Sequence, residues 1–154
     1  MSRCLAGIIR NIQSSWIYKL AKRICECILH IETPTLIFQN IEEDGRFYNQ
    51  INVITLNVGY IDDELELKKS LYHELRHSFQ LQYINNNDNE LSNLFKSDFN
   101  NINNSQFTII DLDAYTFEYD MAKRLDNIEL YHPNLLLDEL INKYKLKYYN
   151  KFFK

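Results

Sequence analysis

The feature that most constrains the fold of this chain is a long stretch, Ile61 to Ile84, that neither glycine nor proline interrupts. Within it leucines recur at every fourth position, at Leu67, Leu71 and Leu75, which is the spacing of one face of an α-helix. Asp62 and Asp63 near the start of the stretch can cap a helix, and the run of asparagines after it can end one. The sequence therefore predicts a helix over about residues 63–84.

Inside this predicted helix stands the run His73-Glu74-Leu75-Arg76-His77. Two histidines four residues apart lie on one face of a helix, with Cβ atoms roughly 5–6 Å apart, so both rings can reach one metal ion. The glutamate beside the first histidine can take a proton from a metal-bound water. His73 and His77 are therefore candidate ligands of a zinc ion, and Glu74 is the candidate general base. The alternative is a surface helix that carries two solvated histidines.

Three segments before the helix predict a small sheet. Ile51–Val58 is rich in β-branched residues and alternates in part, which favours a strand. Thr35–Gln39 is another candidate strand, and Gly45–Asn49 is either a turn or a short strand. Proteins that hold an extended peptide often add it to an exposed strand edge. Because Ile51–Val58 comes just before the helix, it is the strand that we expect to offer such an edge near the metal. An ordinary core strand is a compatible alternative.

With these motifs the chain resembles small zincin metallopeptidases of the gluzincin-like kind, such as those of phages and mobile elements. It is also similar to the ImmA/IrrE group, which is associated with the cleavage of repressor proteins. The resemblance rests on His73–His77, on the later segment Asp111–Glu118 and on the strand before the helix, and it covers about Thr35 to Leu125. It implies a zinc-dependent hydrolase that cleaves peptide bonds with metal-activated water. Its substrate would be a protein or peptide, such as a repressor or another regulatory protein.

The resemblance also implies a third zinc ligand in a second helix, predicted over about residues 111–126. Where the family places a glutamate, this chain has Asp111, whose carboxylate is shorter by one methylene but can still bind zinc at about 2.0–2.2 Å. Asp113 and Glu118 are the alternatives, in that order, and Asp113 can instead hold an imidazole N–H. Asp111 and Asp113 point about 200° apart on an ideal helix, so we do not expect both to bind one ion. Acids also occur at a helix N-terminus simply because they complement the helix dipole.

A peptidase of this kind also needs a hydrogen-bond donor for the developing oxyanion. Tyr115, His132 and Tyr72 are candidates, and the sequence does not choose among them. The alternative function is a non-catalytic module of a mobile element, which would hold zinc for structure, or lack it, and act by binding a partner protein. An open coordination position favours the enzyme, and a closed one favours the module.

Length and composition predict one domain over residues 1–154, of the α+β class, in which a small, partly antiparallel sheet packs on helices. Its predicted core is about residues 35–126. An N-terminal helix is predicted over about residues 8–29, and a C-terminal helix over about residues 134–150. A polar insertion with a short helix around Glu90–Lys96 separates the two ligand-bearing helices. In the C-terminal helix lysines alternate with aromatic residues. We expect the lysines to be solvated and the aromatic rings to pack inward, rather than to contact a membrane or nucleic acid.

Charge and cysteine content restrict the partners and the compartment. The net charge of −4 gives no support for nucleic-acid binding. The short apolar run at the N-terminus predicts neither a signal peptide nor a membrane span. Cys4, Cys25 and Cys27 are odd in number and clustered, which favours reduced thiols and a cytoplasmic location. Cys25, Cys27 and His30 could also form a metal cluster, but thiols two residues apart on a helix point about 200° apart.

Overall fold

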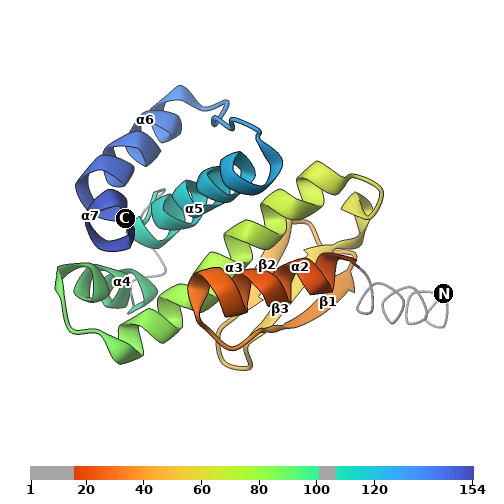
Figure 1. Ribbon diagram of the computed structural model, residues 1–154, viewed down its shortest axis with the longest axis horizontal. Helices are drawn as coiled ribbons and strands as arrows, with labels where there is room; N and C mark the ends of the chain where they lie inside the picture. The colour runs from red at the N-terminus through yellow and green to blue at the C-terminus, as the bar shows by residue number, and fades with distance from the viewer. Residues whose placement is uncertain (1–15, 101–106) are drawn as a thin grey trace. The chain divides into compact units, whose positions relative to one another are not determined.

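The computed structural model describes residues 16–100 and 107–154 (Figure 1). The chain forms two compact units, Met1–Phe79 and Gln80–Lys154, and the boundary between them falls within the long helix α3 (Glu64–Asn86). Helices together with a small mixed sheet confirm the predicted α+β class. The prediction of a single domain stays a prediction.

The N-terminal helix is described from its residue 16 onward, so residues 8–15 of the predicted span, and Cys4, lie outside the described residues. α2 (Trp16–Ile24) passes directly into a π-helical segment, η1 (Cys25–Leu29). His30 ends this segment in the left-handed region, with φ 55°. The buried side chains of α2 are Ile17, Ala21 and Ile24.

In the first unit β1 (Thr35–Gln39), β2 (Gly45–Tyr48) and β3 (Val53–Asn57) form a sheet in the order β1-β3-β2. β3 pairs in parallel with β1 and antiparallel with β2, where Gly45 lies opposite Leu56. The strand that we expected to offer a free edge is therefore central, and that prediction is wrong. Its side chains are buried on both faces of the sheet, which suits a strand with a hydrogen-bonded neighbour on each side.

The core of the first unit follows the two periodicities of the sequence. Strand residues that are two apart point to one face of a sheet, and those on one face of β1 and β3 are fully buried: Leu36, Phe38, Ile54 and Leu56. The leucines at every fourth position of α3 are buried as well, as their spacing predicts: Leu67, Leu71 and Leu75.

Two side chains hold the connection between β3 and α3. Asn57, the last residue of β3, donates from Nδ2 to the carbonyl oxygens of Ile41 and Glu43, at 3.0 and 3.1 Å, and so joins the β1–β2 loop to the end of β3. Asp63 then caps α3, because its carboxylate accepts the backbone N–H of Glu66 at 3.1 Å. One of the two predicted caps thus performs this role.

The second unit contains α4 (Glu90–Asn100), α5 (Ile109–Asp126), α6 (Leu135–Tyr144), a π-helical segment η3 (Lys145–Tyr149) and α7 (Asn150–Phe153). α4 is longer than the short helix predicted there, and α5 begins close to its predicted start. The last three elements follow one another without a break, where the sequence predicts a helix over about residues 134–150. α5 packs against α4, α6 and η3 (Figure 1).

Aromatic residues of the C-terminal helix point inward, as expected. Tyr144 and Tyr149 are buried, whereas Leu146 is 76% exposed. No described helix is both long enough and apolar enough to cross a membrane.

Candidate metal centre

The His-Glu-x-x-His run lies in the middle of α3 and belongs to the first unit. Glu74, Leu75 and Arg76 are buried, and His73 and His77 are half-buried. The helix is therefore not a solvated surface helix over its whole circumference, although both histidines are partly exposed. Within this run, only the two histidines have side chains that are partly exposed to solvent.

His73 and His77 lie side by side, as their spacing predicts. The centroids of their rings are 4.9 Å apart, and the ring planes meet at 79° in an edge-to-face arrangement. Two imidazoles this close can supply two nitrogen ligands to one ion. The donor set of two histidines plus a carboxylate from elsewhere is one that catalytic zinc commonly takes.

A hydrogen bond directly after the second histidine fixes the rotation of α3. The hydroxyl of Ser78 donates to Oδ1 of Asn52 at 2.9 Å. Asn52 lies between β2 and β3 with φ 50°, in the left-handed region that asparagine tolerates better than most residues. This bond joins the helix to the sheet and so sets the direction in which the face with His77 points.

The carboxylate of Glu74 lies against the first residue of β2. A β-carbon placed on Gly45 would stand 3.0 Å from Cγ and 3.4 Å from Oε1 of Glu74, and 3.4 Å from the carbonyl oxygen of Thr55. Glycine is thus favoured at this position by space, because a larger residue would push the Glu74 side chain aside by a few tenths of an ångström, and not by its backbone angles. Sequence reasoning missed Gly45, and the one signal available was that the chain contains only 3 glycines.

Among the described residues, no hydrogen bond or ion pair joins the carboxylate of Glu74 to another side chain or to the backbone. The residue as a whole is 7% exposed, but its oxygens are not among the fully buried polar atoms that lack a partner in the described part of the chain. A small molecule can therefore reach the carboxylate, which can accept a proton from it.

In the second unit, Asp111 is bonded to the N-cap residue Thr108 at the start of α5. The hydroxyl of Thr108 donates to Oδ2 of Asp111 at 2.8 Å and accepts the backbone N–H of Asp111 at 3.3 Å. Asp98 of α4 accepts the backbone N–H groups of Ile109 and Ile110. Asp111 is half-buried and does belong to the first turn of the helix, as the dipole alternative expects.

Asp113 occupies a different environment from Asp111. It is fully buried, its Oδ2 accepts the side-chain amide of Gln80 at 2.7 Å, and its Oδ1 accepts the hydroxyl of Tyr144 at 2.7 Å. The same Gln80 amide also donates to the carbonyl oxygen of Ile110 at 2.8 Å. Asp113 thus connects α5 with the last part of α3 and with the end of α6.

The remaining candidates also lie in the second unit, except Tyr72. Glu118 is buried on α5, two turns after Asp111 and so about 10 Å further along the helix. Tyr115 and His132 come together edge to face, with ring centroids 5.4 Å apart. Nδ1 of His132 accepts the backbone N–H of Asn134 at 3.0 Å, which leaves Nε2 as the donor. Tyr72 is buried in the first unit.

The cysteine cluster is not a second metal site among the described residues. Cys25 and Cys27 are free thiols, the first buried and the second exposed, as expected for residues two apart on a helix. Burial raises the pKa of the Cys25 thiol to about 12. Of the residues that the structure describes, Cys25, Cys27 and His30 do not meet as a ligand group.

Comparison of the chain with protein families, with curated proteins and with solved structures found no match. The functional proposal therefore depends on the geometry of the motif and on general chemistry.

Proposed function

We propose that this protein is a zinc-dependent metallopeptidase, with Glu74 as its general base and with His73, His77 and Asp111 as the metal ligands. The observation that carries the proposal is the place of Glu74 on α3, in the same helical turn as two adjacent imidazoles: the residue is 7% exposed, and its carboxylate forms no hydrogen bond or ion pair with the described residues. Carboxylates kept in this way are candidates for proton transfer.

Hydrogen bonds along α3 and α5 support the choice of Asp111 as third ligand. α3 is one continuous helix, and Gln80 lies on it three residues after His77. Its amide donates to the carbonyl oxygen of Ile110, the residue before Asp111. Both oxygens of Asp113 already accept a hydrogen bond, and Glu118 lies two turns beyond this anchor. Asp111 is therefore the best supported of the three acids.

A zinc ion bound at these residues would polarise the scissile carbonyl and make a water more acidic. Glu74 accepts the proton of that water and afterwards passes it to the leaving amine. The hydrogen bond between Ser78 and Asn52 keeps the helix face that carries the two imidazoles in a fixed orientation relative to the sheet. Tyr115 or His132 supplies a hydrogen bond to the oxyanion, since each carries a donor and the two rings pack together.

The substrate would be an extended peptide or protein segment paired with β2. β2 is the antiparallel edge of the sheet, and its outer side has no strand partner among the described residues. Gly45 begins this strand and contacts Glu74, so the free edge and the base are adjacent. Main-chain hydrogen bonds to such an edge bind a peptide without regard to most of its side chains.

The test combines metal analysis with a cleavage assay on protein purified without a polyhistidine tag. We expect about one zinc per chain, lost in His73→Ala and His77→Ala and retained in the control His30→Asn. Glu74→Gln should keep its zinc and lose about 100-fold or more of the activity on a mixed peptide library. Zinc that persists in both histidine variants would refute the metal site. A zinc-loaded wild type that cleaves no peptide of the library would favour the non-catalytic binding module.

A further inference from the structure

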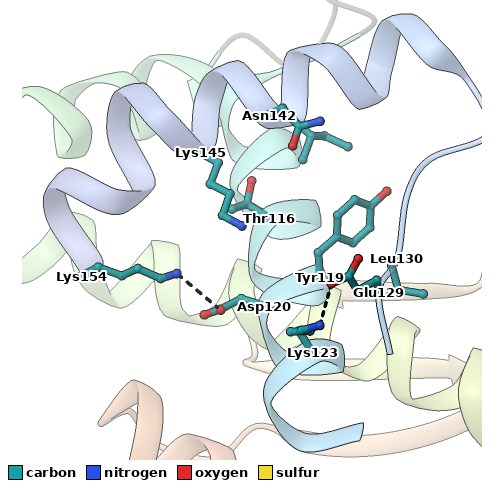
Figure 2. Close-up of a pocket in the computed structure, with 10 residues that line it drawn as sticks. Thr116, Tyr119, Asp120, Lys123, Glu129, Leu130, Asn142, Lys145 and Lys154 are labelled. Atoms are coloured by element: carbon teal, nitrogen blue, oxygen red, sulfur yellow. Dashed lines mark hydrogen bonds and ion pairs between the residues drawn. The ribbon is translucent and has the colours of Figure 1, made fainter. Parts of the chain in front are cut away.

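A pocket of about 360 Å³ lies in the second unit, between α5, the loop that follows it and the C-terminal helical segments (Figure 2). This volume is within the range of sites that take small molecules. Thr116, Tyr119 and Asp120 of α5 contribute to its lining, and Lys145 enters from the start of η3. None of these residues belongs to the proposed metal centre, so the inference does not depend on the proposed function.

The carboxylates of the pocket are already neutralised. Glu129 forms an ion pair of 2.6 Å with Lys123, and this hydrogen-bonded lysine lowers the pKa of the Glu129 carboxyl. Asp120 accepts the hydroxyl of Tyr149 at 3.0 Å and lies 3.9 Å from the ammonium of Lys154. Each acid therefore faces a lysine, and the pocket does not call for a cation.

Lys145 is the exception among the charges. No hydrogen bond or ion pair joins its ammonium to any residue in the described part of the chain. Figure 2 shows its side chain running into the pocket and ending near Thr116. The Thr116 hydroxyl donates its proton to the carbonyl oxygen of Leu112 at 2.7 Å. Lys145 is also the first residue of the π-helical segment η3, and π-helical turns occur frequently at functional sites.

The rest of the pocket offers a neutral donor and apolar surface. The hydroxyl of Tyr119 has no hydrogen-bond partner among the described residues. Burial raises the pKa of this phenol, so it keeps its proton and can donate. Leu130 and Ile141 add apolar lining.

The geometry points to a binding site for a small organic monoanion: a carboxylate held by Lys145, with a short apolar body against Leu130 and Ile141 and the Tyr119 hydroxyl as a further donor in the lining. Three lysines and two carboxylates leave one positive charge in the lining, which matches one negative charge on the ligand. A phosphate dianion suits the pocket less well, because the two carboxylates repel it. Phosphate sites also usually use several backbone N–H groups.

The experiment is an NMR titration of the full chain with sodium butyrate at constant ionic strength. Butylammonium chloride, sodium phosphate and sodium chloride serve as separate arms. Butyrate should give saturable shifts at Tyr119, Leu130, Ile141 and Lys145. Lys145→Gln should weaken its affinity about 10- to 100-fold, as expected for the loss of a charge-assisted hydrogen bond. Lys147→Gln is the matched control, because it removes an exposed lysine two residues further on and should leave the affinity unchanged.

Lys145→Arg keeps the charge and should retain binding, which separates loss of the ligand site from misfolding. Three results would overturn the inference. Butyrate could give no saturable shifts, it could bind equally well to wild type and to a folded Lys145→Gln, or phosphate or butylammonium could bind more tightly than butyrate.

Discussion

Gly45 and Glu74 are 29 positions apart in the sequence, yet Cγ of Glu74 lies 3.0 Å from where a β-carbon of Gly45 would be. The contact places the motif glutamate of α3 against the first residue of the edge strand β2. A β-carbon there would also meet the backbone oxygen of Thr55 at 3.4 Å, so room can be made only by moving Glu74. The position of the Glu74 carboxylate therefore depends on the absence of a β-carbon at Gly45.

Gly45→Ala should displace Glu74 while leaving the two histidines in place. We expect a loss of about 1–3 kcal/mol in the free energy of unfolding from overpacking. On the proposed function, kcat should fall with zinc content unchanged. Denaturant unfolding, zinc analysis and the peptide assay measure these effects. Gly59→Ala is the control, since its new methyl would meet the side chain of Asn57 and not Glu74. Wild-type activity in Gly45→Ala would contradict the positioning role.

The role of Asp111 as a ligand can be separated from its hydrogen bonds with the N-cap residue Thr108. Asp111→Ala should lose the zinc and the bond from the Thr108 hydroxyl to the carboxylate, but keep the backbone N–H that Thr108 caps. Asp111→Glu should bind zinc because glutamate occupies this position in the family that the chain resembles. Thr108→Ala removes the cap and the hydroxyl that donates to Asp111 but leaves the carboxylate in place, so it should cost about 0.5–2 kcal/mol of stability and leave zinc bound. Competition with a chelator measures the affinity, and thermal unfolding measures the cap. If Asp111→Ala and Thr108→Ala retain zinc equally well, Asp111 is not a ligand.

Asp113 should prove to be chiefly a structural residue. Asp113→Ala leaves the buried amide of Gln80 and the hydroxyl of Tyr144 without this acceptor, so we expect a loss of about 2–4 kcal/mol in unfolding free energy. Zinc affinity should fall less than in Asp111→Ala. Tyr144→Phe removes one of the two bonds and should cost about 1 kcal/mol, while Tyr131→Phe, at an exposed position, should cost nothing measurable. Urea titrations of the variants give these values. An Asp113→Ala variant as stable as the wild type would rule out the network.

The two described cysteines should differ sharply in reactivity. Burial raises the pKa of Cys25 from 9.0 to about 12, so its thiol stays protonated in the folded protein. Iodoacetamide at pH 8 should modify Cys27 and spare Cys25, as mass spectrometry of the digested protein can show. An unfolded chain ionises this thiol at lower pH than the fold does. Its contribution to stability is therefore present below about pH 9 and is lost as the pH rises toward 12. Equal labelling of both cysteines at pH 8 would contradict this burial.

Local patterns in the sequence were sufficient for α3, because its leucine spacing and uninterrupted run concern neighbours within a few residues. They also predicted that Asp111 and Asp113 point in different directions, because residues two apart on a helix differ by about 200° in rotation. The place of β3 in the sheet was not predictable, since it depends on pairing with both flanking strands. The contact between Gly45 and Glu74 arises only when the sheet meets α3, and no local pattern encodes it.

The lysines of the C-terminal helix show the same limit. Their alternation with aromatic residues predicts solvated ammonium groups. For Lys143 this prediction is correct, since its ammonium is exposed and pairs with the exposed Glu139 of the preceding turn. Lys145 instead enters a pocket, at the point where the regular helix α6 passes into the π-helical segment η3. A widened turn cannot be recognised from spacing that assumes a regular helix.

The length of β2 limits how much of a partner chain its edge can hold. A strand that runs only from Gly45 to Tyr48 spans roughly 13 Å, at about 3.4 Å for each antiparallel residue. A chain that pairs with it can form ladder hydrogen bonds over about four residues and no more. Short edges of this kind are poor templates for edge-to-edge aggregation. They also leave selectivity between long polypeptides to contacts beyond the strand.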